Sequence, residues 1–149
     1  MDMEQFKLTG EHGYIVISIE EVWGYPSSTS HFGGYDTIGT VELKSGNYKL
    51  AGELWFTTGE VYSFYSQLGD CYKNLQGTAT FCNHEMNLTI EVAFSNRGQV
   101  IIRGSYKEQS HVDNELRFEF HSDQSYIAAT LKEIECLVEK YGDMKGKKV

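Results

Sequence analysis

The segment HSDQS, which begins at His121, contains three residue types that hydrolases combine in their active sites. Ser122 and Ser125 carry the hydroxyl of a nucleophile. His121 carries the imidazole of a general base, and Asp123 the carboxylate that orients such a base. Catalytic groups of this kind must meet in space, whereas neighbours at a strand-to-helix junction point apart, and no glycine-flanked nucleophile elbow is present. The segment therefore predicts the cap of a helix, with a partner contact by His121 or Gln124 as the alternative.

No other pattern predicts a catalytic centre, a metal site or a cofactor. The five histidines form no H-x-H or H-x-x-x-H pair, and the three cysteines are widely spaced, so neither zinc nor a disulfide framework is predicted. The glycines Gly33 and Gly34 lack the lysine and the following helix of a phosphate-binding loop. Carboxylates are spread over predicted strands and turns, and the sequence does not show which of them pair. We therefore predict that the protein is not an enzyme and holds no cofactor.

The spacing of apolar residues predicts an α+β fold that is mainly an antiparallel β-sheet or sandwich. Period-2 alternation, as in the segment LTIEVAF, indicates strands, and turn sequences such as SNRG separate them. The segment EVYSFYSQL has helical spacing instead. It predicts a short helix between strands, over about residues 60–70. Thr57 and Glu60 form the pattern of a capping box before this helix, and Gly69 weakens its end.

A longer helical pattern near the end of the chain predicts a C-terminal helix over about residues 123–141. Ser122 or Asp123 is expected to cap its first turn, and Gly142 its last. No linker or repeat divides the sequence, so we predict one domain over residues 1–149 with a folded core over about 5–142. The lysines after the helix are expected to lie in a frayed basic tail over residues 143–149.

The balance of charge limits the kinds of partner. The formal net charge is −8, with 13 basic and 21 acidic residues. Subtracting Lys145, Lys147 and Lys148 from the 13 leaves 10 basic residues, so the rest of the chain carries about −11. Direct nucleic-acid binding needs basic surface and is not predicted. A basic protein partner fits this charge, and solubility alone is the alternative.

Aromatic and acidic residues at predicted loops and strand faces are the candidates for binding that partner. The loop before Asp36 carries several aromatics and is expected to be exposed, and tyrosine and tryptophan are favoured at protein interfaces. Alternation also places Glu53, Glu91 and Glu119 on the outward faces of predicted strands. If those strands are neighbours, the three glutamates form an acidic stripe beside Trp55. The predicted contact residues are Tyr35, Asp36, Glu53, Trp55, Glu91 and Glu119.

The order of these signals resembles the WapI family of bacterial immunity proteins. The resemblance covers roughly residues 12–142 and is carried by GNYKLAGELW, LQGTATF and FEFHSDQSY. It implies a cytoplasmic antidote to the toxin domain of a wall-associated, contact-dependent toxin, and the toxins of the name-giving members are nucleases acting on tRNA. Absence of a signal-peptide pattern at the N-terminus and of any membrane-spanning run also predicts a cytoplasmic protein. The expected mechanism is occlusion, in which carboxylates face a basic groove of the toxin.

Two other classes of function predict different structures. A small-ligand-binding β domain predicts an open pocket between sheet and helix that is lined by aromatics. A hydrolase predicts ionisable side chains gathered in a cleft, around paired carboxylates or His121. An exposed edge strand would also permit a dimer, but the sequence does not show which strand lies at an edge, so the oligomeric state is not predicted.

Overall fold

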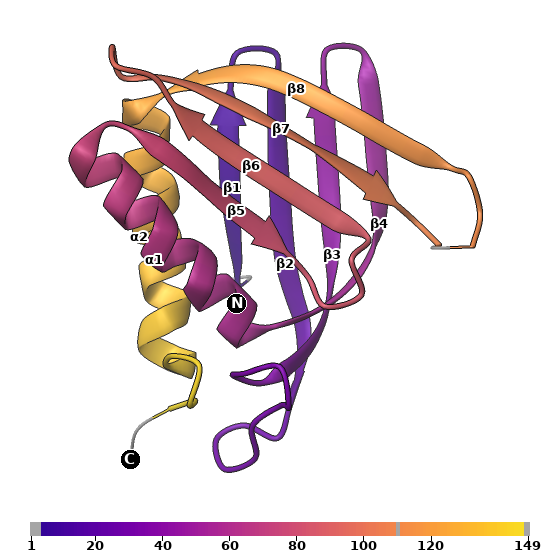
Figure 1. The fold of residues 1–149 in the computed structure, drawn as a ribbon. Helices are drawn as coiled ribbons and strands as arrows, with labels where there is room; N and C mark the ends of the chain where they lie inside the picture. The colour runs from indigo at the N-terminus through magenta and orange to yellow at the C-terminus, as the bar shows by residue number, and fades with distance from the viewer. Residues whose placement is uncertain (1–3, 110, 148–149) are drawn as a thin grey trace.

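The computed structural model describes residues 4–109 and 111–147. Two four-stranded antiparallel sheets pack face to face, and two helices lie along one side of them (Figure 1). The first sheet has the order β1 (Gln5–Gly10), β2 (Gly13–Trp23), β3 (Asp36–Ser45) and β4 (Tyr48–Thr57). The second has the order β5 (Gly77–Cys82), β6 (Leu88–Phe94), β7 (Gln99–Lys107) and β8 (Glu115–Asp123). The helices are α1 (Thr58–Asn74) and α2 (Gln124–Tyr141). The predicted α+β class is confirmed.

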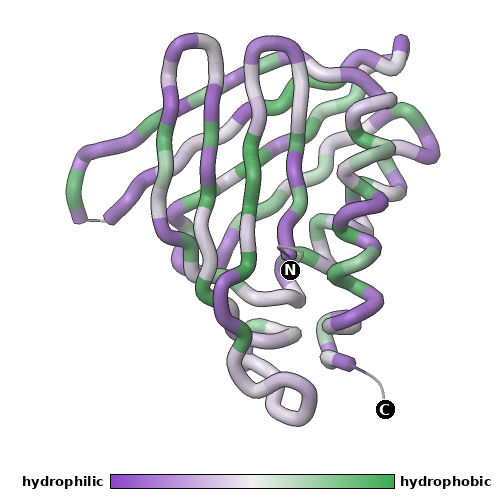
Figure 2. Tube along the Cα trace, turned by 180° about the vertical axis from the view of Figure 1, so that it is seen from behind, coloured by the Kyte–Doolittle hydropathy of each residue, from purple (hydrophilic) through white to green (hydrophobic). Residues whose placement is uncertain are grey.

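Alternation along the strands produces the core between the two sheets. Within each sheet, every strand pairs with the next one along the chain. Apolar side chains recur at every second position, so one face of each sheet is apolar. Seen from behind, the strands of the first sheet alternate between hydrophilic and hydrophobic along their length (Figure 2). The largest fully buried side chains of the core include Phe6, Phe56, Phe64 and Phe81, which contact one another at ring-centroid distances of 6.0–6.4 Å.

Helix α1 extends further than the sequence predicts. It spans Thr58–Asn74 rather than about 60–70, and Leu75 in a left-handed conformation follows its end. A glycine inside a helix costs only about 1 kcal/mol. Leu68 and Cys71, on either side of Gly69, are buried, and tertiary packing of this kind outweighs intrinsic helix propensity. The predicted capping box is confirmed, because the Thr57 hydroxyl accepts from the Glu60 amide and the Glu60 carboxylate accepts from the Thr57 amide.

Replacing Thr57 with alanine is expected to lower the free energy of unfolding by about 1–2 kcal/mol, as observed for other helix caps. Thr57 is buried, so water does not readily take the place of its hydroxyl. The substitution therefore leaves the Glu60 amide without a hydrogen-bond acceptor. Denaturant unfolding followed by circular dichroism would measure the change. Thr78→Ala, at an exposed threonine of β5, is the matched control and should change stability by less than about 0.5 kcal/mol. Equal effects of the two substitutions would contradict the capping role.

The C-terminal helix and its caps agree with the sequence, but the residues after it do not. Asp123 caps α2, and Gly142 follows it with φ +81°. The expected frayed tail is wrong for residues 143–147, which pack against the loop before β3. Gly34 donates its amide hydrogen to the Met144 carbonyl at 2.8 Å, and the Lys147 amide donates to the Tyr35 hydroxyl at 2.7 Å. The last part of that predicted tail, residues 148–149, lies outside the described residues.

Candidate functional site

The HSDQS segment is a hinge between β8 and α2. His121 lies on the exposed face of β8, whereas the neighbouring Ser122 is buried and donates to the Thr9 carbonyl at 2.6 Å. Asp123 accepts from the Ser125 amide at 2.9 Å and so caps the helix. The hydrogen bond from the Ser125 side chain is the main reason why the pKa of Asp123 is lowered. Because these side chains point to different surroundings, they do not form a hydrolase triad.

His84 joins the aromatic loop to the start of α1. Its ring stacks on Phe32 at a centroid distance of 4.4 Å, and Nδ1 lies 3.3 Å from a carboxylate oxygen of Glu60. Burial raises the pKa of Glu60, and hydrogen bonds from Thr57 and His84 oppose that rise. Within residues 4–109 and 111–147, no group of three or more histidine, cysteine, aspartate or glutamate side chains is placed to hold a metal ion. Through these two contacts, His84 connects Phe32 of the loop to Glu60 of α1.

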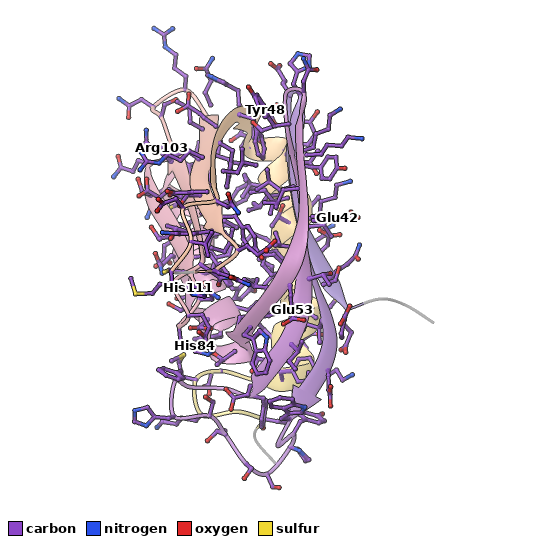
Figure 3. All side chains as sticks on the ribbon, turned by 90° about the vertical axis from the view of Figure 1, so that its right-hand side faces the viewer. Glu42, Tyr48, Glu53, His84, Arg103 and His111 are labelled. Atoms are coloured by element: carbon purple, nitrogen blue, oxygen red, sulfur yellow. The ribbon has the colours of Figure 1, made fainter. Side chains whose placement is uncertain are left out.

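Three of the six predicted contact residues lie together on the outer face of the first sheet. Glu53 and Trp55 are exposed residues of β4, and Asp36 lies at the start of β3. The Trp55 indole donates to the Glu53 carboxylate at 2.7 Å, which fixes the ring beside the charge. Figure 3 views the two sheets edge-on, with Glu53 on β4 and Glu42 on the side away from the second sheet. This outer face is open to solvent at Glu42, Glu53 and Trp55.

The predicted acidic stripe is wrong, because its glutamates lie on different sheets. Glu91 and Glu119 belong to the outer face of the second sheet, and Arg103 of β7 lies between them in the strand register. Arg103 pairs with Glu91 at 3.2 Å. The row of Glu91, Arg103 and Glu119 therefore alternates in charge. The core between the two sheets separates this row from Glu53.

The predicted exposure of Tyr35 is also wrong. Its side chain is fully buried, and its hydroxyl donates to the Pro26 carbonyl at 2.7 Å. The same loop does expose Tyr25 and Phe32, as expected. Tyr35 instead supports the loop from beneath and receives the amide hydrogen of Lys147. A side chain in this position is not available to a partner's surface, so we remove Tyr35 from the candidate contacts.

The structure adds two residues that the sequence did not place. Trp23 of β2 meets Trp55 edge to face, with ring centroids 5.5 Å apart, and the two side chains are 43% and 41% exposed. Glu21 shares a row of the strand register with Ile38 and Trp55. Strand register brings these residues together, and the sequence contains no signal for it. We call Glu21, Trp23, Asp36, Glu53 and Trp55 the acidic aromatic face.

A shallow groove of about 570 Å³ continues from this face around the edge of β4. Its lining contains carboxylates and aromatics but neither lysine nor arginine: Glu53, Trp55, Glu85, Asn87, Tyr106, Glu108 and Gln109. The Tyr106 hydroxyl crosses from the second sheet and donates to the Glu53 carbonyl at 2.8 Å. Burial, followed by the charges of Glu108 and Glu53, raises the pKa of Tyr106. The groove therefore has a negative potential that favours cations.

Where the described residues of the first sheet meet the helices, the space differs from the open aromatic pocket that a small-ligand-binding domain predicts. The apolar space between β2 and the two helices has no room for a water molecule, and it is lined by Ile19, Thr58, Val61, Leu137 and Val138. Aromatic side chains of the core fill the space between the sheets by contacting one another. The groove at the edge of β4 opens to solvent instead.

The fold and the exposed residues define an α+β sandwich with an uncovered sheet face that combines tryptophan and carboxylates. The chain belongs to the Immunity protein WapI-like family, whose model matches residues 7–142. The resemblance seen in the sequence is thereby confirmed, and membership supports a toxin-neutralising role with a toxin as the partner. No curated protein matches the chain. Neither described helix combines the length and apolar character needed to cross a bilayer.

Proposed function

We propose that this protein neutralises a cognate nuclease toxin in the cytoplasm by binding over the toxin's active site with its acidic aromatic face. Membership of the immunity family supports the toxin as partner. The protein itself performs no catalysis and does not contact nucleic acid. Its contribution is to bury the toxin's basic cleft so that RNA or DNA no longer enters.

The single observation that carries the choice of face is the pair of exposed tryptophans flanked by carboxylates. The ring centroids of Trp23 and Trp55 are 5.5 Å apart, and the Trp55 indole N–H donates to the Glu53 carboxylate at 2.7 Å. Clustered aromatics supply most of the binding energy at protein interfaces. Nucleases that grip phosphates present basic clefts, and a surface of opposite charge speeds the encounter with such a cleft.

Co-expression with a candidate toxin domain from a gene neighbouring this one would test the proposal. We expect survival of the cells and a complex that weakens as salt is raised, since screening reduces attraction between exposed charges. No rescue and no binding, with both proteins folded, would remove the proposed function for that pair.

A matched pair of charge reversals tests the chosen face. Asp36→Lys with Glu53→Lys should abolish rescue, because it turns attraction into repulsion at the acidic aromatic face. Glu91→Lys with Glu119→Lys makes the same change of net charge on the second sheet and should leave rescue intact. Loss of rescue only in the second variant would place the toxin on the other sheet and would retain the immunity function.

A further inference from the structure

The two sheets have four edge strands, and other parts of the chain bond to the backbone edge of three of them, β1, β5 and β8. At β1, Lys7 donates its amide hydrogen to Glu133 of α2 at 3.0 Å, and its carbonyl accepts from the Thr130 hydroxyl at 2.6 Å. At β5, Gln67 of α1 accepts from the Thr80 amide at 3.0 Å and donates to the Thr80 carbonyl at 3.4 Å. Side chains of the two helices thus occupy these edges.

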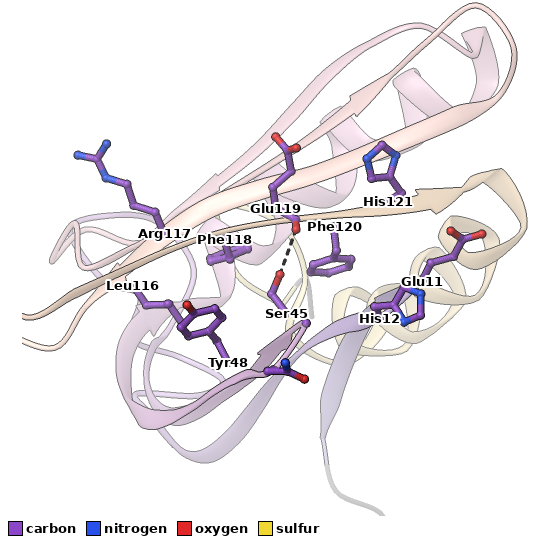
Figure 4. A pocket seen from close by; sticks show the side chains of 12 residues that line it. Glu11, His12, Ser45, Tyr48, Leu116, Arg117, Phe118, Glu119, Phe120 and His121 are labelled. Carbon is purple, nitrogen blue, oxygen red and sulfur yellow. Dashed lines mark hydrogen bonds between the residues drawn. The ribbon is translucent and has the colours of Figure 1, made fainter.

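The tips of two hairpins from the first sheet cap the second half of the β8 edge, at Glu119 and His121. The Glu11 amide donates to the His121 carbonyl at 2.7 Å, and the Ser45 hydroxyl donates to the Glu119 carbonyl at 3.0 Å. Figure 4 shows this contact, with Ser45 below the strand that carries Glu119. Exposed strand edges pair readily with other chains, so these contacts shorten the part of three edges that is open to such pairing.

The fourth edge, β4, is open over its first half. Tyr48 and Ser45 flank the two-residue turn and pair across it, so even-numbered residues of β4 bond to β3 and odd-numbered ones face the edge. Two edge carbonyls are occupied, since Glu53 accepts from Tyr106 at 2.8 Å and Trp55 from Asn83 at 2.8 Å. Among the described residues, no side chain reaches the backbone of Lys49 or Ala51.

We propose that this open edge pairs antiparallel with β4 of a second copy of the same chain, about a two-fold axis at Ala51. In that register, the Ala51 amide donates to the carbonyl of the second copy's Ala51, and the Ala51 carbonyl accepts from the amide of that same residue. Lys49 then lies directly opposite Glu53 of the second copy, and Glu53 opposite the second copy's Lys49. The Glu53 carbonyl accepts a further hydrogen bond beside that from Tyr106, because a carbonyl oxygen has two lone pairs.

The charges along this edge are complementary to a second copy. Lys49, Ala51 and Glu53 are all exposed, and they lie on one face because they alternate along the strand. Within the chain, Lys49 is opposite Lys44, and like charges in that position repel each other. Among the described residues, no carboxylate lies within ion-pairing distance of Lys49. A second copy supplies one on each side of the axis.

The charges also distinguish the β4 edge from an edge whose charged residues serve only to prevent pairing with other chains. Protective edges carry charges that repel an incoming strand of the same kind. Here lysine and glutamate stand at equal distances from Ala51, so that the two-fold operation exchanges one for the other. The small alanine at the axis lets the two backbones approach. The result is a continuous eight-stranded sheet with an isologous interface.

Sedimentation equilibrium of the full chain without toxin, over a concentration series, tests this proposal. The expected result is a reversible dimer. Lys49→Glu places two like-charge pairs across the axis and should raise the dissociation constant at least about tenfold. Lys49→Glu with Glu53→Lys exchanges the charges and should restore dissociation to within about threefold of the original protein. Lys73→Glu on α1, with the same change of net charge, should have no effect.

Three results would overturn the dimer. They are a monomer at every concentration, an unchanged dissociation constant in Lys49→Glu, and no recovery in the exchanged variant. Circular dichroism of each variant shows whether it is folded, and the exchanged variant keeps the test valid if one single substitution unfolds the chain. Sedimentation is measured without toxin, so it tests the dimer separately from the proposed function. A chain that is monomeric in sedimentation and still protects cells in co-expression would overturn the dimer and leave the proposed function standing.

Discussion

Replacing Phe81 with alanine is expected to lower the free energy of unfolding by about 3–5 kcal/mol. Phe81 is fully buried near the end of β5 and contacts three other phenylalanines, with ring centroids at 6.4 Å from Phe6, 6.4 Å from Phe56 and 6.0 Å from Phe64. These partners come from β1, β4 and α1, so one side chain joins both sheets and a helix. Single domains have a total stability of about 5–15 kcal/mol, so this loss brings the protein close to unfolding.

Thermal and denaturant unfolding would measure this effect. Phe32→Ala is the matched control, since Phe32 is half exposed and contacts mainly His31 and His84. It should cost less than about 1 kcal/mol. A cost below that value for Phe81→Ala would mean that the surrounding rings close the cavity, and that the core is less rigid than its packing implies.

Replacing Trp55 with alanine is expected to weaken binding of the cognate toxin about 30-fold or more, with little change in stability. A loss of this size corresponds to about 2 kcal/mol, the usual threshold for an interface hot spot. Trp55 is the residue of the acidic aromatic face with most partners, because it contacts both Trp23 and Glu53. Its side chain is already half exposed, so truncation removes little buried area from the core.

Titration calorimetry with a catalytically inactive toxin domain would measure the affinity. Tyr72→Ala removes an equally exposed aromatic from α1, on another side of the molecule, and should change the affinity less than about threefold. Trp55→Phe should fall between the two, because it keeps an aromatic ring but loses the hydrogen bond to Glu53. Equal losses for Trp55→Ala and Tyr72→Ala would show that the toxin does not use this face.

Local patterns in the sequence predicted most of the elements. The alternation in LTIEVAF is strand β6 with four buried residues at every second position. The helical stripe near the end of the chain is α2, and both of its caps were readable, because capping depends on residues adjacent in sequence. Helix α1 extends beyond the predicted range, since the burial of Leu68 and Cys71 depends on tertiary packing that helical spacing does not show.

The candidate site depended on information that local patterns lack. Glu53 and Glu91 both occupy outward positions of alternating strands, and nothing in the sequence assigns β4 and β6 to different sheets. Trp23 and Trp55 are far apart in the chain and meet only through β3, which pairs with both of their strands. Tyr35 was misread because an aromatic at the end of a polar loop gives no sign of which way it turns.

The closure of β1 by α2 has a consequence for how the protein is made. Lys7 and its partner Glu133 are 126 residues apart, a stretch that a ribosome synthesises in roughly 6–25 s at usual rates. During that interval, the first hairpins emerge with the backbone edge of β1 unoccupied. An unoccupied strand edge pairs readily with other chains, so the nascent chain is most exposed to such pairing during this interval. The β1 edge reaches its final hydrogen bonds only after α2 has left the ribosome.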